Sequence, residues 1–248
     1  GEAILNKDKS FIQQEAINQK NAGAMLLDAN CGVSAEHEVE NMEWLVNTIQ
    51  EVCDLPLVID SPNPEVIARG LSVCKTPAIV NSITADEDVI SRIIPLALKY
   101  NSDVIALTMK DKKIPDTVEK RMEIVREIIE SVKNKGFPPA KIYFDPLVRP
   151  ISTEPEQTLV FLSTLREIKN IPEVKTVCGL SNVSFGLPKR GLLNSTFLAM
   201  SMAYGLDAVL IDPTDERMMS VFYAARALLK KDDFCMEYIS AFREGKLK

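Results

Sequence analysis

The sequence contains a single histidine, His37, and this scarcity excludes several kinds of site. A zinc site built from several imidazoles is impossible, and a Ser-His-Asp triad would need His37 itself. His37 follows Ser34-Ala35-Glu36 and precedes Glu38, a polar pattern typical of the start of a helix. We therefore interpret His37 as a surface residue rather than a catalytic base.

Disulfide pairs, membrane spans and an N-terminal signal peptide are not indicated either. The cysteines number five, are scattered and include no Cys-x-x-Cys pair, which favours free thiols in a reducing cytoplasm. No apolar run reaches the length of a membrane span, and the chain opens with a polar segment, residues 1–10. We predict a cytoplasmic protein that does not enter a membrane.

The sequence also lacks the features of nucleic-acid and nucleotide binders. Its net charge is -6, with acids and bases interleaved, whereas a protein that binds phosphate backbones is basic. No Gly-x-Gly-x-x-Gly or Walker A segment follows any predicted strand. We expect small-molecule and protein partners, and no nucleic acid.

Short apolar segments alternate with helical patterns along all 248 residues. Runs rich in Val and Ile are typical of strands buried on both faces, and helices between successive strands require parallel pairing. No Pro/Gly/Ser-rich linker interrupts the pattern, so we predict one domain over residues 1–248. The expected strands cover residues 25–30, 56–60, 78–81, 104–109, 141–145, 174–180 and 208–212. The expected helices cover about residues 11–21, 39–53, 64–73, 88–100, 118–135, 156–169, 193–204, 216–229 and 236–242.

Seven strands are one fewer than a closed barrel requires, and the chain begins with the segment that should follow the first strand. We predict an α/β fold of the (β/α)8 TIM-barrel class whose first strand is missing from this sequence. An open doubly wound sheet is the alternative.

Most predicted strands end in a carboxylate or an amide. In a barrel the carboxyl ends of the strands surround one mouth, where the chemistry takes place. Each residue alone is equally consistent with a turn or helix cap, because Asp and Asn side chains bond nearby backbone amides. The residues are Asp28, Asn30, Asp60, Asn81, Asp145, Asn182 and Asp212.

Such a set of side chains suits a neutral heterocycle with many hydrogen-bond donors, such as a pterin, or a divalent metal. No cluster of Arg or Lys lies at the strand ends, so a phosphorylated sugar is not favoured. A Schiff-base aldolase would depend on Lys110, the sole lysine just beyond a strand end, and that interpretation is not favoured.

Several segments resemble those of the pterin-binding methyltransferases, above all the methyltetrahydrofolate:corrinoid protein methyltransferases. The same pterin-binding module also occurs in cobalamin-dependent methionine synthase. The likeness runs in order through residues 26–30, 58–61, 79–82, 107–109, 143–147, 179–184 and 194–200. Three departures stand out. Only Gly1-Glu2 remains of the family's Gly-Glu-Arg-Ile-Asn segment, and Phe185 occupies a position that is polar in some relatives. The C-terminal Arg-x-His pair of dihydropteroate synthases is absent.

The resemblance implies methyl transfer between N5 of methyltetrahydrofolate, or a related pterin, and the cobalt of a cobalamin (corrinoid). It implies that Asp60, Asn81 and Asp145 bind the pterin together with Ser181 and Asn182. Asn182 is the implied catalytic residue, which stabilises N5 in the transition state. No metal is expected to be held by this chain.

The resemblance also implies partners. The chain has no Asp-x-His-x-x-Gly motif for a corrinoid, so we expect the corrinoid to be carried by a partner protein. Arg190 is a candidate for the glutamate tail of folate, although a solvated surface arginine is the interpretation that we favour. The family tends to form homodimers, for which Phe197, Met200 and Met202 are candidates, but we favour a buried helix face for them.

Two other functions stay open at this point. One is a condensing enzyme similar to dihydropteroate synthase, and the other is a non-catalytic pterin-binding protein.

Overall fold

A computed structural model of the protein describes residues 1–32 and 37–248, and these form two compact units. Unit 1 comprises residues 1–107 and 127–143, and unit 2 comprises residues 108–126 and 144–248. Segment 34–36, predicted to open a helix, lies outside the described residues. His37 precedes helix α3 and its side chain is 65% exposed, as expected for a surface residue.

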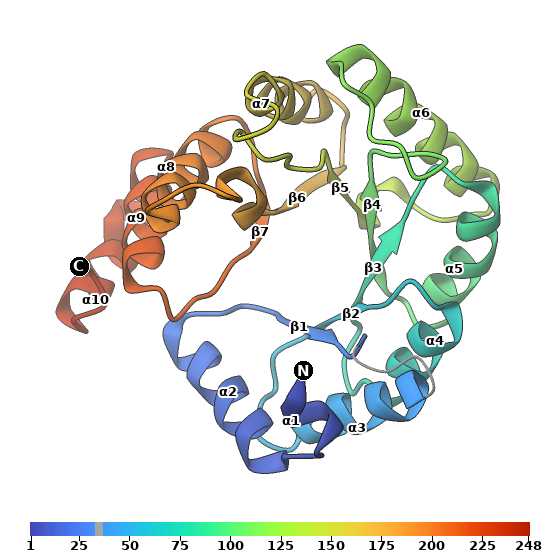
Figure 1. Ribbon diagram of the computed structural model, residues 1–248, viewed down its shortest axis with the longest axis horizontal. Coiled ribbons are helices and arrows are strands. Elements are labelled where there is room, and N and C mark those ends of the chain that lie inside the picture. Colours follow the sequence, from blue (N-terminus) through green and yellow to red (C-terminus); the bar gives the residue numbers. More distant parts are fainter. Residues whose placement is uncertain (33–36) are drawn as a thin grey trace. The chain divides into compact units, whose positions relative to one another are not determined.

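Unit 1 begins with two helices and then alternates strands and helices from β1 onward (Figure 1). The elements that lie wholly within it are α1 (Glu2–Leu5), α2 (Lys9–Ala22), β1 (Leu27–Asn30), α3 (Glu38–Gln50), β2 (Leu57–Asp60), α4 (Pro64–Val73), β3 (Ile79–Ile83), α5 (Glu87–Lys99), β4 (Asp103–Leu107) and the 3-10 helix η2 (Pro139–Lys141). Helix α6 (Val118–Asn134) and strand β5 (Ile142–Asp145) contribute residues to both units.

The helix starts and ends of unit 1 follow from local chemistry. Helix α4 begins with Pro64, whose missing N–H is no loss in the first turn, and the Asn63 side chain accepts a hydrogen bond from the Glu65 N–H at 3.0 Å. Gly70 lets α4 approach the sheet closely, because a Cβ at this position would lie 2.8 Å from Ile59 Cγ2.

The first four strands pair in parallel, with a register that matters for the site. Leu27 is opposite Leu57, and Asn30 at the end of β1 is opposite Asp60 at the end of β2. Asp60 is in turn opposite Asn81 of β3. A bulge between Asn81 and Ile83 shifts the pairing of β3 with β4. The alternating burial of β1 places Leu27 and Ala29 in the core and leaves Asp28 and Asn30 exposed.

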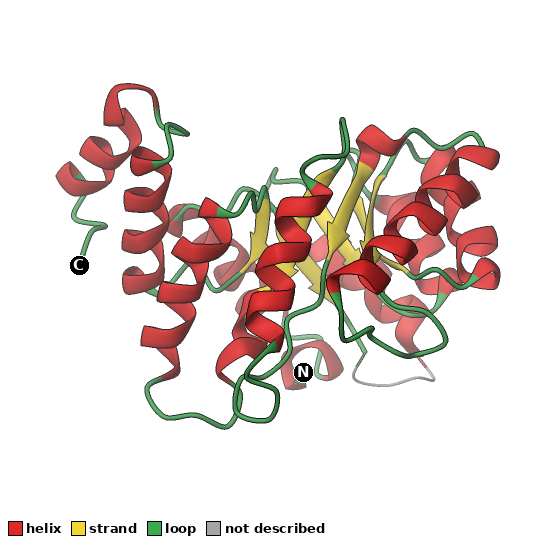
Figure 2. Cartoon of the chain, turned by 90° about the horizontal axis from the view of Figure 1, so that it is seen from above, coloured by secondary structure: helices red, strands yellow, loops and turns green. Residues whose placement is uncertain are grey.

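Unit 2 continues the same alternation (Figure 1), and Figure 2 distinguishes the helices of the chain, in red, from its strands, in yellow. Its elements are α7 (Gln157–Ile168), β6 (Lys175–Gly179), the 3-10 helix η3 (Leu180–Ser184), α8 (Arg190–Ala203), β7 (Ala208–Leu210), α9 (Glu216–Leu228), the 3-10 helix η4 (Asp233–Cys235) and α10 (Met236–Arg243). Strands β6 and β7 are parallel, and α8 packs against α9.

The core of unit 2 contains the face of α8 that we interpreted as buried. Phe197 and Met202 lie in this core, and the ring of Phe197 is 5.3 Å from that of Phe161 on α7. Only Met200 of the three candidate interface residues is exposed. The interpretation as a buried helix face is confirmed for Phe197 and Met202.

The seven predicted strands are all present in the described residues, in the order β1-β2-β3-β4-β5-β6-β7. Helix α8 begins at Arg190, three residues earlier than predicted, and β1 begins at Leu27 rather than Met25. Residues 2–5 are helical. Among the described residues, no helix combines the length and apolarity needed to cross a membrane. The single domain and the missing first strand stay predictions.

Candidate functional site

A row of three polar side chains crosses adjacent strands of unit 1. Asn30, Asp60 and Asn81 are register partners on β1, β2 and β3, and neighbouring strands lie about 4.8 Å apart. Asn30 Nδ2 donates a hydrogen bond to Asp60 Oδ2 at 2.8 Å, while Asn30 Oδ1 accepts one from the Gly32 N–H at 3.0 Å. The Asn30 amide is thus held by both ends, and it orients the carboxylate of Asp60.

Two of the polar candidates in unit 1, Asn81 and Asp28, do not end their strands as predicted. Asn81 is the third residue of β3, which continues through the bulge to Ile83. Asp28 is the second residue of β1, because the strand extends to Asn30. The predicted strand, residues 25–30, ends at the same residue but begins two residues earlier than β1.

Asp28 is an unusual carboxylate in unit 1. Desolvation by the surrounding protein, followed by the negative charge of Asp60, raises the pKa of Asp28 to about 7. The residue is nevertheless exposed to solvent. Burial and the charge of Asp60 thus both favour the protonated form of Asp28.

Asp145, the last residue of β5, is the buried carboxylate of unit 2. Its exposed fraction is 8%, and burial raises its pKa to about 7. The N–H groups of Leu147 (2.7 Å) and Gly179 bond its carboxylate, and with the positive charge of Arg121 they oppose that rise. Asp145 is therefore fixed in orientation and titrates close to neutrality.

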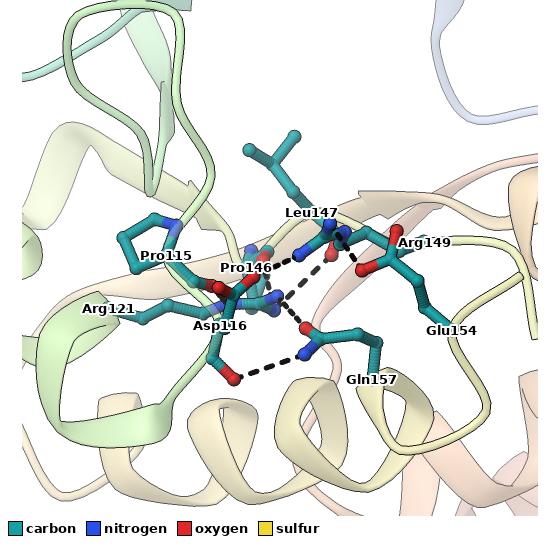
Figure 3. Close-up of polar contacts among 8 residues, drawn as sticks. All are labelled: Pro115, Asp116, Arg121, Pro146, Leu147, Arg149, Glu154 and Gln157. Atoms are coloured by element: carbon teal, nitrogen blue, oxygen red, sulfur yellow. Dashed lines mark hydrogen bonds and ion pairs between the residues drawn. The ribbon is translucent and has the colours of Figure 1, made fainter.

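Arg121, on α6, is a residue of this site that the sequence interpretation missed. It is fully buried and bonds the backbone carbonyls that directly follow Asp145, those of Pro146 at 2.7 Å and Leu147 at 3.4 Å (Figure 3). A signal was present in the sequence. Arg121 lies on the same face of α6 as the buried residues Val125 and Ile128. A charged residue therefore occupies a position where the helical pattern calls for an apolar one.

Asn182 and Ser181 lie in η3, which directly follows β6, and both are exposed. The Asn182 side chain makes no hydrogen bond to any residue that the structure describes, whereas its backbone carbonyl accepts from the Phe185 N–H at 3.1 Å. Phe185 itself is 62% exposed, and its carbonyl accepts from Ser152 Oγ at 2.7 Å. The backbone of this loop is fixed while the amide of Asn182 stays available.

Arg190, the first residue of α8, contacts the same loop. Its guanidinium donates from Nη2 to the carbonyl of Ser181 at 2.7 Å and from Nε to the hydroxyl of Ser184 at 3.0 Å. The residue is exposed, as favoured, but it is bonded to protein rather than simply solvated. Contact with a folate tail stays a prediction.

The remaining candidates have other roles or surroundings. Asp212 lies two residues beyond β7, and its carboxylate accepts hydrogen bonds from both the N–H and the hydroxyl of Thr214, at 2.9 and 2.7 Å. Asp212 therefore caps a turn, the alternative that applied to each of these residues. Lys110 forms a backbone bridge with Lys113. Among the described residues, no group of three or more His, Cys, Asp or Glu could hold a metal ion.

Comparison with known sequences points in one direction. The profile of a family described as "Pterin binding enzyme" matches residues 2–212. A methylcorrinoid:tetrahydrofolate methyltransferase from Eubacterium limosum is 38% identical over 99% of this chain and 92% of its own length. A methionine synthase from Mycobacterium leprae is 30% identical over 85% of this chain, which covers 18% of that protein.

Comparison with solved structures shows the fold. A dihydropteroate synthase from Xanthomonas albilineans aligns with a TM-score of 0.67 over 86% of this chain and 84% of its own, at 16% identity. A Yersinia pestis DHPS aligns with a TM-score of 0.65 over 84% and 86%, at 18% identity. The predicted α/β barrel fold with parallel strands is confirmed.

Proposed function

The chain belongs to the pterin-binding enzyme family, and from this premise we propose that it transfers a methyl group between N5 of methyltetrahydrofolate and the cobalt of a corrinoid. The observation that carries the proposal is the match to a methylcorrinoid:tetrahydrofolate methyltransferase over nearly the full length of both chains. The polar side chains at β2, β3, β5 and η3 are of the types that such a substrate requires.

Asp145 is proposed to recognise the pterin. A pterin carries a cyclic guanidine edge, with a ring N–H beside an exocyclic amino group, and an ionised carboxylate accepts both hydrogen bonds. A buried carboxylate binds such an edge strongly because water does not compete there. Asp60 and Asn81 are proposed to bond other atoms of the ring, and Ser181 to contact it from η3. The pterin must therefore meet Asp145 in its ionised form.

Asn182 is proposed to act on the reacting nitrogen. A tertiary amine is a poor leaving group, so N5 must be stabilised as its bond to the methyl carbon breaks. The free amide of Asn182 can orient toward N5 without supplying a strong acid, which would destroy a reduced cobalt nucleophile. The proton that N5 finally gains comes from solvent, and by microscopic reversibility the same groups serve both directions of transfer.

The corrinoid, when bound to its carrier, supplies the cobalt that accepts or donates the methyl group. We propose that a partner protein carries it, and that the enzyme is a cytoplasmic homodimer. The printed name of the Eubacterium limosum relative supports the corrinoid as co-substrate. Sedimentation of the purified chain tests the dimer.

The experiment for the proposed function is a spectroscopic assay of cobalt methylation. Purified protein is mixed with methyltetrahydrofolate and a reduced corrinoid, free or on a carrier protein. Growth of the methylated-cobalt spectrum in proportion to enzyme supports the proposal. Tight pterin binding without methylation would instead indicate a pterin-binding protein. Condensation of a pterin pyrophosphate with p-aminobenzoate, without methyl transfer, would indicate a synthase.

A further inference from the structure

Arg121 is a charged residue placed where helix α6 supplies core residues. With Val125, Ile128 and Val132 it forms a stripe at helical spacing whose four members are all fully buried. A guanidinium removed from water is costly unless its N–H groups are bonded to protein. The hydrogen-bond partners of Arg121 therefore indicate its role.

The guanidinium bonds three backbone carbonyls and one side chain (Figure 3). Nε donates to the carbonyl of Pro115 at 2.9 Å, and Nη1 donates to those of Pro146 at 2.7 Å and Leu147 at 3.4 Å. Nη2 donates to Gln157 Oε1 at 2.6 Å. The guanidinium of Arg121 thus links the segment before α6 to the segment after β5.

A second layer of contacts holds this arrangement without neutralising Arg121. Gln157 Nε2 donates to the carbonyl of Asp116 at 3.1 Å. The nearby carboxylates of Asp116 and Glu154 both form ion pairs with Arg149 (Figure 3). Burial, then repulsion by Arg149, lowers the pKa of Arg121 to about 10, so it stays charged at neutral pH.

The two carbonyls after β5 belong to the turn that orients Asp145. The Leu147 N–H donates to Asp145 Oδ1 at 2.7 Å, and Leu147 has a φ of 66°, a backbone conformation that costs energy for a residue other than glycine. Hydrogen bonds from Arg121 to both carbonyls keep the turn in this conformation. We propose that Arg121 is a positioning residue for pterin recognition, which fixes the Asp145 carboxylate in the orientation that meets the guanidine edge of the substrate.

This inference rests on the proposed function and adds an electrostatic consequence. Arg121 favours the ionised form of Asp145, which pterin binding requires, against the effect of burial. Within the part of the chain that the structure describes, a second titratable group that interacts with Asp145 is the Cys178 thiol on β6, whose pKa burial and Asp145 both raise, so it stays uncharged. Loss of the Arg121 charge should therefore shift the pKa of Asp145 upward.

The test measures methyltetrahydrofolate affinity by titration calorimetry between about pH 6 and 9, with the full-length chain. Arg121→Lys keeps the charge but not the planar fork, so affinity should fall about tenfold while its pH dependence stays. Arg121→Met should lose about 100-fold, and the loss of affinity on acidification should begin at higher pH. Arg149→Met is the matched control, because the ion pairs of Arg149 within the described residues go to Asp116 and Glu154 and not to Asp145 or its turn, so the affinity of this variant should stay within about twofold.

Each possible result either supports or overturns the proposed role of Arg121. Wild-type affinity in Arg121→Lys overturns the inference, as does a weakened Arg121→Met whose affinity keeps the wild-type pH dependence. If Arg121→Met does not fold, the affinity and the melting temperature of Arg121→Lys replace it in the test. A loss of methyltetrahydrofolate affinity in Arg121→Lys no larger than that in Arg149→Met overturns the inference. A wild-type protein that binds no pterin at all would remove the proposed function instead.

Discussion

The end of β5 and the 3-10 helix η3 that follows β6 present their polar side chains in opposite ways. Asp145 is buried, and its carboxylate is bonded by backbone N–H groups and lies in the field of a buried arginine. Asn182 is exposed, and its amide makes no hydrogen bond within the described residues, although an exposed arginine, Arg190, bonds the loop around it. A group that recognises an unchanging edge benefits from being fixed, whereas a group that responds to a reacting atom must be free to move toward it.

Replacement of Asn182 should give the largest effect. Asn182→Ala removes a hydrogen bond that is important only in the transition state, so single-turnover methyl transfer should slow about 10²–10³-fold. Methyltetrahydrofolate affinity should change by less than about threefold, because Asp145 is untouched. Rapid-mixing spectroscopy measures the rate, and Asn170→Ala, which changes an exposed amide two residues beyond the end of α7, is the control. An unchanged rate removes Asn182 from the chemistry.

Replacement of Asp145 should weaken pterin binding more than it slows methyl transfer, the opposite of the effect expected at Asn182. Asp145→Asn loses a charge-assisted pair of hydrogen bonds, so pterin affinity should fall about 10–100-fold. The rate at saturating pterin should fall much less. Asp212→Asn is the control, because that carboxylate only caps a turn. Equal affinity of Asp145→Asn and wild type would place the pterin elsewhere.

The same substitution should stabilise the protein without ligand. The folded-state pKa of Asp145, about 7, lies above its ordinary value of 3.8, so the contribution of Asp145 to stability is present below about pH 4 and lost as pH rises through 7. At pH 8, Asp145→Asn should raise the free energy of unfolding by about 1–2 kcal/mol, and at pH 4 the gain should disappear. Urea unfolding at both values checks this. A gain of equal size at both values would show that ionisation is not its cause.

Replacement of Arg190 should give the smallest effect and separate its two roles. Arg190→Met frees the carbonyl of Ser181, so the Asn182 loop should lose order and turnover should fall about 3–10-fold. If the contact with the loop is the reason, the loss is the same for methyltetrahydrofolate and for a methylated tetrahydropterin that lacks the glutamate tail. A loss confined to the substrate with the tail would support the folate-tail role.

Much of the fold could be predicted because helices and strands have local signals. The predicted start of α4 at Pro64 agrees with the structure, and the predicted end of α2, about residue 21, lies one residue before its observed end at Ala22. The burial of Arg121 could not be predicted in the same way. Its partners Pro146 and Gln157 are 25 and 36 residues away in sequence, so its environment exists only in the fold. The predicted role of Arg190 did not include its bonds to η3, which depend on a helix that begins three residues earlier than its pattern.

The most direct test is a crystal structure of the protein with methyltetrahydrofolate bound. We expect the guanidine edge of the pterin within hydrogen-bonding distance, about 3 Å, of both Asp145 carboxylate oxygens, with the Asn182 amide turned toward N5. A pterin bound at any other place, with Asp145 still bonded only to backbone N–H groups, would contradict it.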